Sequence, residues 1–404
     1  QNVSSYYTFA RLVSIANLGY TFGEGSVLPK YSTLGAPIAS DMTWETAQQW
    51  DFGFDLTMLG NRLNLTVDGY IRDTRDMLTD GVELPAVYGA SVPDMNAADL
   101  RTKGYEITLN WRDQLTLAGK PFEYSVGVNL SDYKSVVTKY DNKDKTFAQP
   151  YYEGMEIGEI WGFVTDGLFQ SDEEAQAYAE QLDLSYVLKG QTGGWQAGDV
   201  KFVNLDGDNK IGIGSNNVDN PGDRKILGNS LPSLSYGITA SVRWNGIDVS
   251  AFFQGTGNHY WYPDGESMPF WGAYSYPYLS FLQKDFLKDV WSPENTDAYF
   301  PRAMAYSASG GVLSNVNDRY LQNIRYMRFK NLTVGYTLPQ QWTKKAGIES
   351  VRVYFTGENL CYWSPLKKHS KYVDPEGAID RSGAYNNAFY PWQKSFLFGI
   401  DVTF

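Results

Sequence analysis

The sequence feature that most constrains the fold is the alternation of apolar and polar residues, which is clearest in residues 392–404. Trp392, Phe396 and every second residue after it are apolar, and Lys394 is the one break in this parity. The other parity is polar apart from Leu397. A period of two predicts a β-strand with one apolar and one polar face. From this stretch alone, the last strand of a soluble sandwich and a strand of a membrane barrel are equally good interpretations.

The same alternation recurs in eight further segments, and a weaker strand candidate, Tyr6–Val13, precedes them. Asn245-Gly246 lies between two of the segments and is a pair favoured in two-residue β-hairpins. The predicted fold class is therefore all-β with antiparallel strands. The eight segments are residues 49–58, 63–71, 105–111, 122–130, 234–244, 247–253, 331–336 and 351–356.

The connections between these segments are alternately short and long. A sandwich has no reason to place all its long connections at one end, whereas a membrane barrel has short periplasmic turns and long extracellular loops. The polar faces suit a water-filled interior, and Asn110, Asn129, Arg243 and Asn331 fall on them by parity. We therefore predict a transmembrane antiparallel β-barrel with long extracellular loops and a periplasmic C-terminus.

The composition excludes several other classes. No run of about 18 apolar residues exists, so a membrane-spanning helix is excluded. The formal net charge of −12 argues against nucleic acid as a partner. The single cysteine, Cys361, rules out an intramolecular disulfide, and with only two histidines a zinc centre is improbable.

The predicted sheet is expected to be part of a larger barrel. The chain begins at Gln1 without a signal-peptide pattern, which favours a C-terminal piece of a longer protein. A sheet with two unpaired edges is also prohibitive in hydrocarbon, because its backbone N–H and C=O groups would lack partners. We therefore expect another segment of the same protein to supply the missing strands.

Ten short motifs occur in order along the whole chain and together resemble the C-terminal half of the SusC/RagA family of TonB-dependent outer-membrane transporters. Each motif is weak alone, but the ordered set is specific. One small departure is Asn209, which stands where the family often has Gly. The motifs are TWET (43–46), GVELP (81–85), KGYE (103–106), WGFVTDGLF (161–169), DGDNKI (206–211), ILGN (226–229), WSPEN (291–295), FKNLTVGY (329–336), GENL (357–360) and DPEG (374–377).

The resemblance implies that residues 1–404 are the C-terminal part of a presumed 22-stranded barrel, whose plug and N-terminal strands this chain lacks. It implies a place in the bacterial outer membrane, a SusD-like surface lipoprotein as a lid, and energy from the TonB complex through the missing N-terminal region. The implied function is active import of an oligomeric nutrient, an oligosaccharide or an oligopeptide. A passive porin and a secreted β-rich glycan-binding protein remain as alternatives.

Residues 257–281 form a long connection that is dense in aromatic residues and has no simple period. Aromatic faces stack on sugar rings or hold peptide side chains, and Tyr and Trp are favoured at protein interfaces. The alternative is that these residues pack the loop against itself. The residues predicted to contact the substrate or, preferably, the lid protein are Tyr260, Trp261, Tyr262, Phe270, Trp271, Tyr274 and Tyr276.

Asn204, Asp206 and Asp208 lie at alternate positions and are followed by Lys210. Oxygen ligands at every second residue of a loop can surround Ca²⁺. However, Ser215 occupies the position of the last acidic ligand of an EF-hand loop. We therefore favour an Asx-rich turn whose side chains bind their own backbone, and predict no required cofactor. A structural Ca²⁺ at these four residues is the alternative.

Ser171 precedes a short helical pattern that runs to Leu182, and Glu174 is placed to complete a capping box. The loops also hold many other Asp and Glu residues, as a glycosidase would need. Spacing alone does not single out a catalytic pair among them. We therefore predict that the protein is not an enzyme.

Overall fold

The fold was analysed in a computed structural model of the chain, which divides into two compact units. The first unit comprises residues 1–51, 70–103 and 134–157, and the second comprises the rest. Most of the predicted strand Tyr6–Val13 lies outside the described residues. The structure describes residues 11, 13–17, 19, 28–40, 42–81, 87, 92–189, 191, 193–279, 282, 284–370, 372–378 and 392–404.

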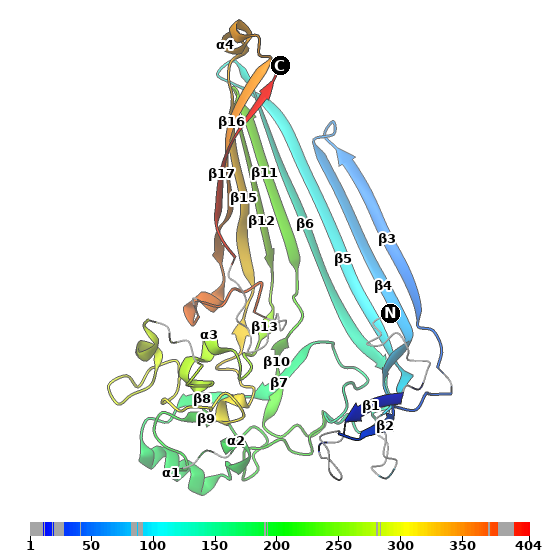
Figure 1. The fold of residues 1–404 in the computed structure, drawn as a ribbon, viewed down its shortest axis with the longest axis vertical. Coiled ribbons are helices and arrows are strands. Elements are labelled where there is room, and N and C mark those ends of the chain that lie inside the picture. The colour runs from blue at the N-terminus through cyan, green and yellow to red at the C-terminus, as the bar shows by residue number, and fades with distance from the viewer. Residues whose placement is uncertain are drawn as a thin grey trace. The chain divides into compact units, whose positions relative to one another are not determined.

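Nine strands form one sheet, in which spatial order follows chain order (Figure 1). The nine strands predicted from alternation are confirmed, and the pairings from β6 to β17 are antiparallel. Within the described residues, the outermost strands β3 and β17 each pair with one neighbour in this sheet. The strands are β3 (Thr46–Met58), β4 (Leu63–Asp80), β5 (Asp94–Leu117), β6 (Lys120–Lys139), β11 (Ser235–Trp244), β12 (Ile247–Thr256), β15 (Tyr326–Thr337), β16 (Ser350–Trp363) and β17 (Ser395–Thr403).

Strands β4 and β5 are longer than the alternation predicts. The predicted end at Ile71 becomes Asp80, and the predicted start at Tyr105 becomes Asp94. The added residues 72–80 are polar or charged apart from the adjacent Met77 and Leu78, so they carry no period of two. Asp76 also has a positive φ of 55°, which interrupts the regular strand. The alternation of apolar and polar residues therefore predicts only the part of a strand that has an apolar face.

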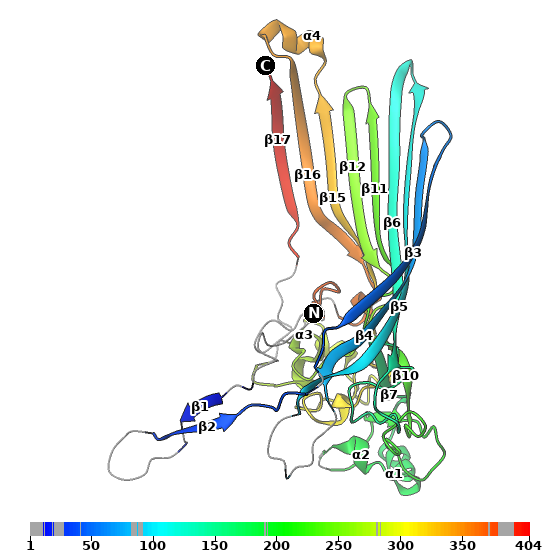
Figure 2. The ribbon, with the colours of Figure 1, turned by 90° about the vertical axis from the view of Figure 1, so that its right-hand side faces the viewer.

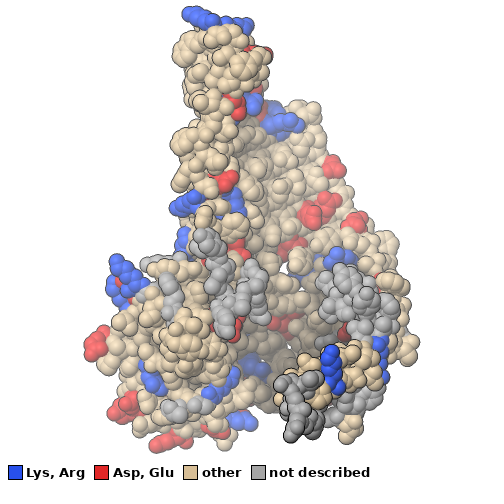
Figure 3. Space-filling model, in the orientation of Figure 1, with Lys and Arg blue, Asp and Glu red and all other residues tan. Residues whose placement is uncertain are grey.

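The two faces of the sheet differ in chemistry as predicted. Hydrogen bonds cross between strands on the polar face, as between the hydroxyl groups of Ser125 and Ser241 at 2.7 Å. Phe398, on the other face, is 82% exposed. Large patches of exposed apolar side chains mark surfaces that contact a partner or a membrane. On the side drawn in Figure 3, most of the surface over the strands is uncharged. Exposed apolar residues of the outermost strands are Trp50, Phe52, Phe54, Phe396, Phe398 and Ile400.

Short turns join β3 to β4, β5 to β6, β11 to β12 and β15 to β16 at one end of the sheet, which we call the turn end. The predicted Asn245-Gly246 hairpin is present, with positive φ angles of 50° and 84°. The turn from β15 to β16 carries α4 (Gln340–Thr343), which lies at the same end of these strands as the C-terminus (Figure 2). The long connections leave the other end, which we call the loop end.

The long connections contain secondary structure of their own. Strand β7 pairs with β10, β8 with β9 and β13 with β14. The predicted N-cap of α1 is confirmed, because Ser171 Oγ accepts a hydrogen bond from the Glu174 backbone N–H at 3.2 Å. These elements are β7 (Glu159–Phe163), β8 (Thr165–Leu168), α1 (Asp172–Gln181), α2 (Ser185–Leu188), β9 (Val200–Phe202), β10 (Arg224–Asn229), β13 (Tyr260–Trp261), α3 (Met268–Trp271) and β14 (Gln322–Asn323).

The first unit contains a separate hairpin and a small core. β1 (Val13–Asn17) pairs antiparallel with β2 (Lys30–Leu34). Ala98, Val137 and Tyr140 form the buried core of this unit. Among the described residues, every helix is too short or too polar to span a bilayer.

Candidate functional site

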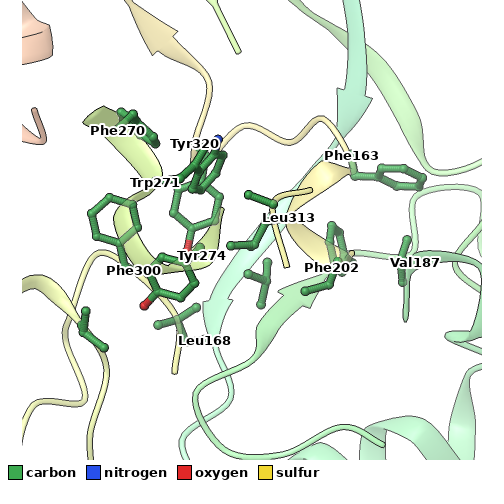
Figure 4. Packing of buried hydrophobic residues seen from close by; sticks show 14 of the residues in the cluster. Phe163, Leu168, Val187, Phe202, Phe270, Trp271, Tyr274, Phe300, Leu313 and Tyr320 are labelled. Atoms are coloured by element: carbon green, nitrogen blue, oxygen red, sulfur yellow. The ribbon is translucent and has the colours of Figure 1, made fainter. Parts of the chain in front are cut away.

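The long connections of the second unit pack around a hydrophobic core, which we call the loop core. It draws residues from the β6–β11, β12–β15 and β16–β17 connections, so segments far apart in sequence are held together. Figure 4 shows the rings of Trp271, Tyr274, Phe300 and Tyr320 gathered on one side and Phe202 on the other. Loop-core residues include Phe163, Phe169, Val187, Phe202, Phe270, Trp271, Tyr274, Phe300, Leu313, Tyr320, Leu366 and Val373.

Four of the residues predicted to make contacts belong to the loop core: Trp261, which also lines the groove described below, and the three packed residues Phe270, Trp271 and Tyr274. Trp271 is 0% exposed, and its ring meets the edge of Phe270 with 4.9 Å between ring centroids. Its indole N–H donates to the carbonyl of Pro263 at 3.0 Å. The structure thus gives these three residues a packing role, the alternative left open by the sequence.

The four predicted residues other than Phe270, Trp271 and Tyr274 line a groove of about 590 Å³, which we call the aromatic groove. Gly265 lies in its wall, where a Cβ atom would stand 2.6 Å from the carbonyl oxygen of Ala308. This close approach joins the segment after β13 to the segment around Ser309. The aromatic groove is lined by Ile160, Ser230, Tyr260, Trp261, Tyr262, Pro263, Asp264, Gly265, Glu266, Tyr276, Ala308, Ser309, Gly310, Ser314 and Val316.

The described lining of the aromatic groove carries two carboxylates, Asp264 and Glu266, and neither Lys nor Arg. One cation lies close by, because Lys189 donates to the lining hydroxyl of Ser314 at 3.0 Å. Aromatic faces beside carboxylates suit polar groups that are neutral or positively charged. The groove therefore offers chemistry for a sugar, a polar peptide or a protein loop.

The hydroxyl groups of two lining tyrosines, Tyr262 and Tyr276, are held by neighbours. Tyr262 Oη donates to the carbonyl of Leu313 at 2.7 Å and accepts from Asn317 Nδ2 at 2.9 Å. Burial raises the pKa of Tyr262 well above its ordinary value, so this hydroxyl stays protonated. Tyr276 Oη accepts from Ser309 Oγ at 2.8 Å. The hydroxyl groups of Tyr262 and Tyr276 are thus engaged by the protein itself.

The Asp-rich segment forms the Asx turns that the sequence favours. Asn204 Oδ1 accepts from the N–H of Gly207 at 2.7 Å, Asp206 Oδ1 from that of Asp208 at 3.1 Å, and Asp208 Oδ1 from that of Lys210 at 2.8 Å. The side-chain oxygens therefore serve the local backbone. In the part of the chain that the structure describes, no group of three or more His, Cys, Asp or Glu residues is placed to hold a metal ion.

Asp223, which was not among the predicted site residues, anchors this segment. It is buried, and its carboxylate accepts from the N–H groups of Leu205 at 2.6 Å and Gly212 at 2.8 Å. Burial raises its pKa, and the two backbone hydrogen bonds oppose that effect. Its distance along the chain from the segment concealed this role in the sequence.

Charged side chains on the polar face gather at the turn end, where they line a hollow of about 710 Å³. Arg62 lies in the β3–β4 turn and the other three ion pairs join different strands; each pair keeps some exposed surface, so its net stabilisation is small. The ion pairs among the residues of this region are Arg62–Asp113 at 3.2 Å, Arg243–Glu123 at 3.3 Å, Arg352–Asp248 at 2.7 Å and Arg352–Asp401 at 3.2 Å.

The residues predicted to lie on the polar face do so. Arg243 takes part in the ion pairs, and a Cβ atom at Gly127 would stand 3.0 Å from Asn110 Oδ1. Asn331 Oδ1 accepts from Thr333 Oγ1 at 3.3 Å. Asn129 pairs in register with Gly237 on β11. Parity predicted the face of each residue but none of the partners.

A buried ion cluster ties the β16–β17 connection to β15 at the loop end, and we call it the Arg328 cluster. Arg328 is 2% exposed, and its Nη2 donates to both carboxylate oxygens of Asp374 at 2.6 and 2.7 Å. Glu376 lies 3.2 Å from Arg328 Nε and 2.9 Å from Lys330 Nζ, and the hydroxyl of Tyr326 hydrogen-bonds it. Lys330 Nζ also lies 4.4 Å from the ring centroid of Trp392. The DPEG motif supplies both carboxylates, although the sequence did not show their partners.

Comparisons with known proteins agree with the sequence motifs. The family model described as "TonB dependent receptor-like, beta-barrel" matches residues 2–202. "TonB-dependent receptor P3" of Formosa agariphila is 27% identical over 427 residues, which cover 100% of this chain and 38% of that protein. "TonB-dependent receptor SusC" of Bacteroides thetaiotaomicron is 24% identical and is matched over 100% of this chain and 36% of its own length. The chain thus spans less than two fifths of these relatives.

Solved structures share the fold. A chain of the structure described as the RagAB peptide transporter superposes with a TM-score of 0.65 at 19% identity, over 98% of this chain and 38% of that chain. The RagAB peptide importer in its open-open state gives a TM-score of 0.66, also at 19% identity, over 99% and 38%. The predicted fold class, all-β strands of a membrane β-barrel, is confirmed. The chain thus carries the β-barrel of the TonB-dependent receptor family over residues 2–202, and the relatives that it matches along its whole length are TonB-dependent receptors, SusC among them.

Proposed function

We propose that residues 1–404 are the C-terminal part of a TonB-dependent importer of the bacterial outer membrane, with the C-terminus in the periplasm. The matched relatives are much longer than this chain, which leaves room in them for a plug and further strands. The outermost strands β3 and β17 each pair with one neighbour in the described sheet. Further strands from the same polypeptide would close it, because unpaired backbone groups are costly in lipid.

The observation that carries this proposal is the two-faced sheet in a chain of this family. The apolar face exposes rows of large side chains such as Phe52 and Phe398, as a lipid-facing surface does. The opposite face carries hydroxyl, amide and paired charged groups, as a wet interior does. Together with the loops at one end, this arrangement provides a wall for a passage and a surface for recognition.

We further propose that the imported nutrient is an oligosaccharide or an oligopeptide, captured together with a SusD-like surface lipoprotein. The importer uses the TonB complex as its energy source and performs no covalent chemistry. The names of the matched relatives and structures, SusC and the RagAB peptide importer among them, support this class of function. Within it, the aromatic groove, with Tyr260 and Tyr276 in its lining, contacts the lid or the substrate.

Uptake by whole cells tests the proposed function. Deletion of the gene for the full-length receptor should abolish growth on one class of oligomer, and deletion of the TonB system should abolish it equally. Uptake that persists without TonB would favour the passive porin. Protein that stays monodisperse without detergent and outside the outer-membrane fraction would favour the secreted glycan-binding protein.

The role of the aromatic groove is tested by Tyr276→Ala in the full-length receptor. Trp342→Ala is the matched control, because Trp342 is an exposed aromatic at the turn end. We expect Tyr276→Ala to weaken uptake or retention of the lipoprotein during purification, while the control leaves both unchanged. Loss of lipoprotein retention assigns the groove to the lid, and loss of uptake with the lipoprotein retained assigns it to the substrate. Unchanged uptake and retention would remove the groove from the proposal.

A further inference from the structure

A second groove of about 700 Å³ lies at the loop end of β11, β12, β15 and β16, and we call it the rim groove. Its lining differs from that of the aromatic groove, because it joins apolar side chains to two cations and contains no Asp or Glu among the described residues. The lining residues that carry the argument are Tyr236, Arg325, Met327, Cys361, Trp363 and Lys367.

The strand register places Tyr236, Met327 and Trp363 of the rim groove on the apolar face of the sheet, while Tyr362 projects from the opposite face at the rim. Phe253 and Phe329 face each other across β12 and β15, and their rings stack with 4.4 Å between centroids on that face. Two residues further toward the loop end, Met327 pairs in register with Trp363. Trp363 therefore projects from the same face, where it is 51% exposed. An interfacial belt of Tyr and Trp occupies this position in membrane proteins.

Tyr236 closes one side of the groove. It pairs in register with Gly255, where a Cβ atom would stand 2.5 Å from the Tyr236 ring. The ring therefore lies flat along the sheet, and its hydroxyl donates to the carbonyl of Tyr326 at 3.2 Å. Gly255 is required here because any side chain would displace that ring. The result is a shallow apolar trough between Tyr236 and Trp363.

The cations Arg325 and Lys367 stand at the loop end of this trough. Both side chains are exposed, and neither forms an ion pair within the described residues. Lys367 Nζ donates to the carbonyl of Tyr362 and lies 3.6 Å from that ring's centroid. The charges of Arg328 and Lys394 and the opposite charge of Asp374 also act on Lys367. Unpaired cations are notable in a chain with a net charge of −12, because carboxylates are abundant elsewhere.

We propose that the rim groove binds an anionic membrane lipid, with its phosphate headgroup on Arg325 and Lys367 and an acyl chain along Met327 and Trp363. The inference rests on the proposed membrane location. Arg binds phosphate through two parallel N–H donors and Lys through a point charge. Basic pockets beside apolar strands or helices recognise anionic lipids in this way. The aromatic groove, with its carboxylates, would repel the same headgroup.

Native mass spectrometry of the detergent-purified full-length receptor tests this assignment. The probes are short-chain phosphatidylglycerol, which is anionic, and phosphatidylcholine of the same chain length, which is not. We expect the wild-type receptor to bind phosphatidylglycerol about tenfold tighter or more, as charge-assisted hydrogen bonds allow. The double variant Arg325→Gln, Lys367→Gln should lose that preference. The control Lys344→Gln, Lys345→Gln removes two exposed cations at the turn end and should keep it.

Three outcomes would overturn the inference. They are equal binding of the two lipids by the wild type, an unchanged preference in the double variant, and displacement of phosphatidylglycerol by an equal concentration of inorganic phosphate. The last would identify a site for a soluble anion. Fractionation of the same cells separates this test from the proposed function. A receptor absent from the outer membrane refutes that function, whereas a receptor located there without lipid preference refutes only the rim-groove assignment.

Discussion

Removal of the guanidinium group of Arg328 should release the β16–β17 connection. In Arg328→Met, the buried carboxylate of Asp374 loses the donor that binds both its oxygens at 2.6 and 2.7 Å, and Glu376 keeps Lys330 and the hydroxyl of Tyr326. Breaking a buried ion pair by removing one partner costs about 3–5 kcal/mol, because a desolvated charge is left behind. Since about 1.4 kcal/mol corresponds to a factor of ten, the connection should open roughly a hundred to a thousand times more often.

Hydrogen exchange in the detergent-purified full-length receptor measures this opening. The reporters are backbone N–H groups in the connection, such as that of Ser370, which donates to Leu366 at 2.8 Å, and that of Gly377, which donates to Asp374 at 3.1 Å. Their exchange should accelerate by about the factor expected from the lost pair. Exchange in β6 and β11 should stay unchanged, because neither strand pairs with β15 or β16.

Arg62→Met is the matched control, because Arg62 forms an ion pair with Asp113 but remains 48% exposed. An exposed pair contributes little, so exchange in the β16–β17 connection should not respond. Arg328→Met, Asp374→Asn should recover part of the protection, since the uncompensated charge is then gone. The reasoning is refuted if Arg328→Met changes exchange no more than Arg62→Met does.

Three further predictions concern the loops. Trp271→Ala should destabilise the loop core by about 3–5 kcal/mol through the cavity it leaves, and thermal unfolding should show this loss while Trp342→Ala shows none. Removal of divalent cations with EDTA should leave the melting temperature unchanged, because Asn204, Asp206 and Asp208 bind their own backbone; a drop that Ca²⁺ restores would contradict this. Burial, followed by the charges of Lys368 and Arg319, lowers the pKa of His369 to about 4, below its ordinary value of about 6.5. Between about pH 6.5 and pH 4, His369 therefore binds a proton more readily in the unfolded chain than in the folded chain. The free energy of unfolding should fall by up to about 3 kcal/mol as the pH drops through this range. His369→Gln should flatten that pH dependence in thermal unfolding, and an unchanged slope would count against it.

The strands could be predicted from the sequence because one face of each is apolar and the other polar along the same length. A register slip by one residue would exchange the two faces, so selection keeps the alternation strict. This is why β11 is found at Ser235–Trp244, close to its predicted bounds. The prediction of β4 stopped at Ile71, because beyond it the only apolar residues are the neighbours Met77 and Leu78, and no alternation remains.

The roles of the aromatic loop residues could not be predicted in the same way. Trp271 and Tyr276 lie five positions apart in a segment without a period, yet one is fully buried and the other lines a groove. Contacts with Tyr320 and Ser309, from a distant part of the connection, decide between the two environments. The Arg328 cluster was hidden for the same reason, since Arg328 and Asp374 are 46 residues apart.

The existence of the loop core has a consequence for how this chain tolerates change. On the apolar face of the sheet, neighbouring molecules are fluid and adapt to any shape, so Ile400 can become Leu, Val or Phe at little cost. Around Trp271 the neighbours are rigid rings, and a new shape leaves a void or a clash. Among homologues, residues on the apolar face of the sheet should therefore vary freely among apolar types. Residues of the loop core should change rarely and in coordinated pairs.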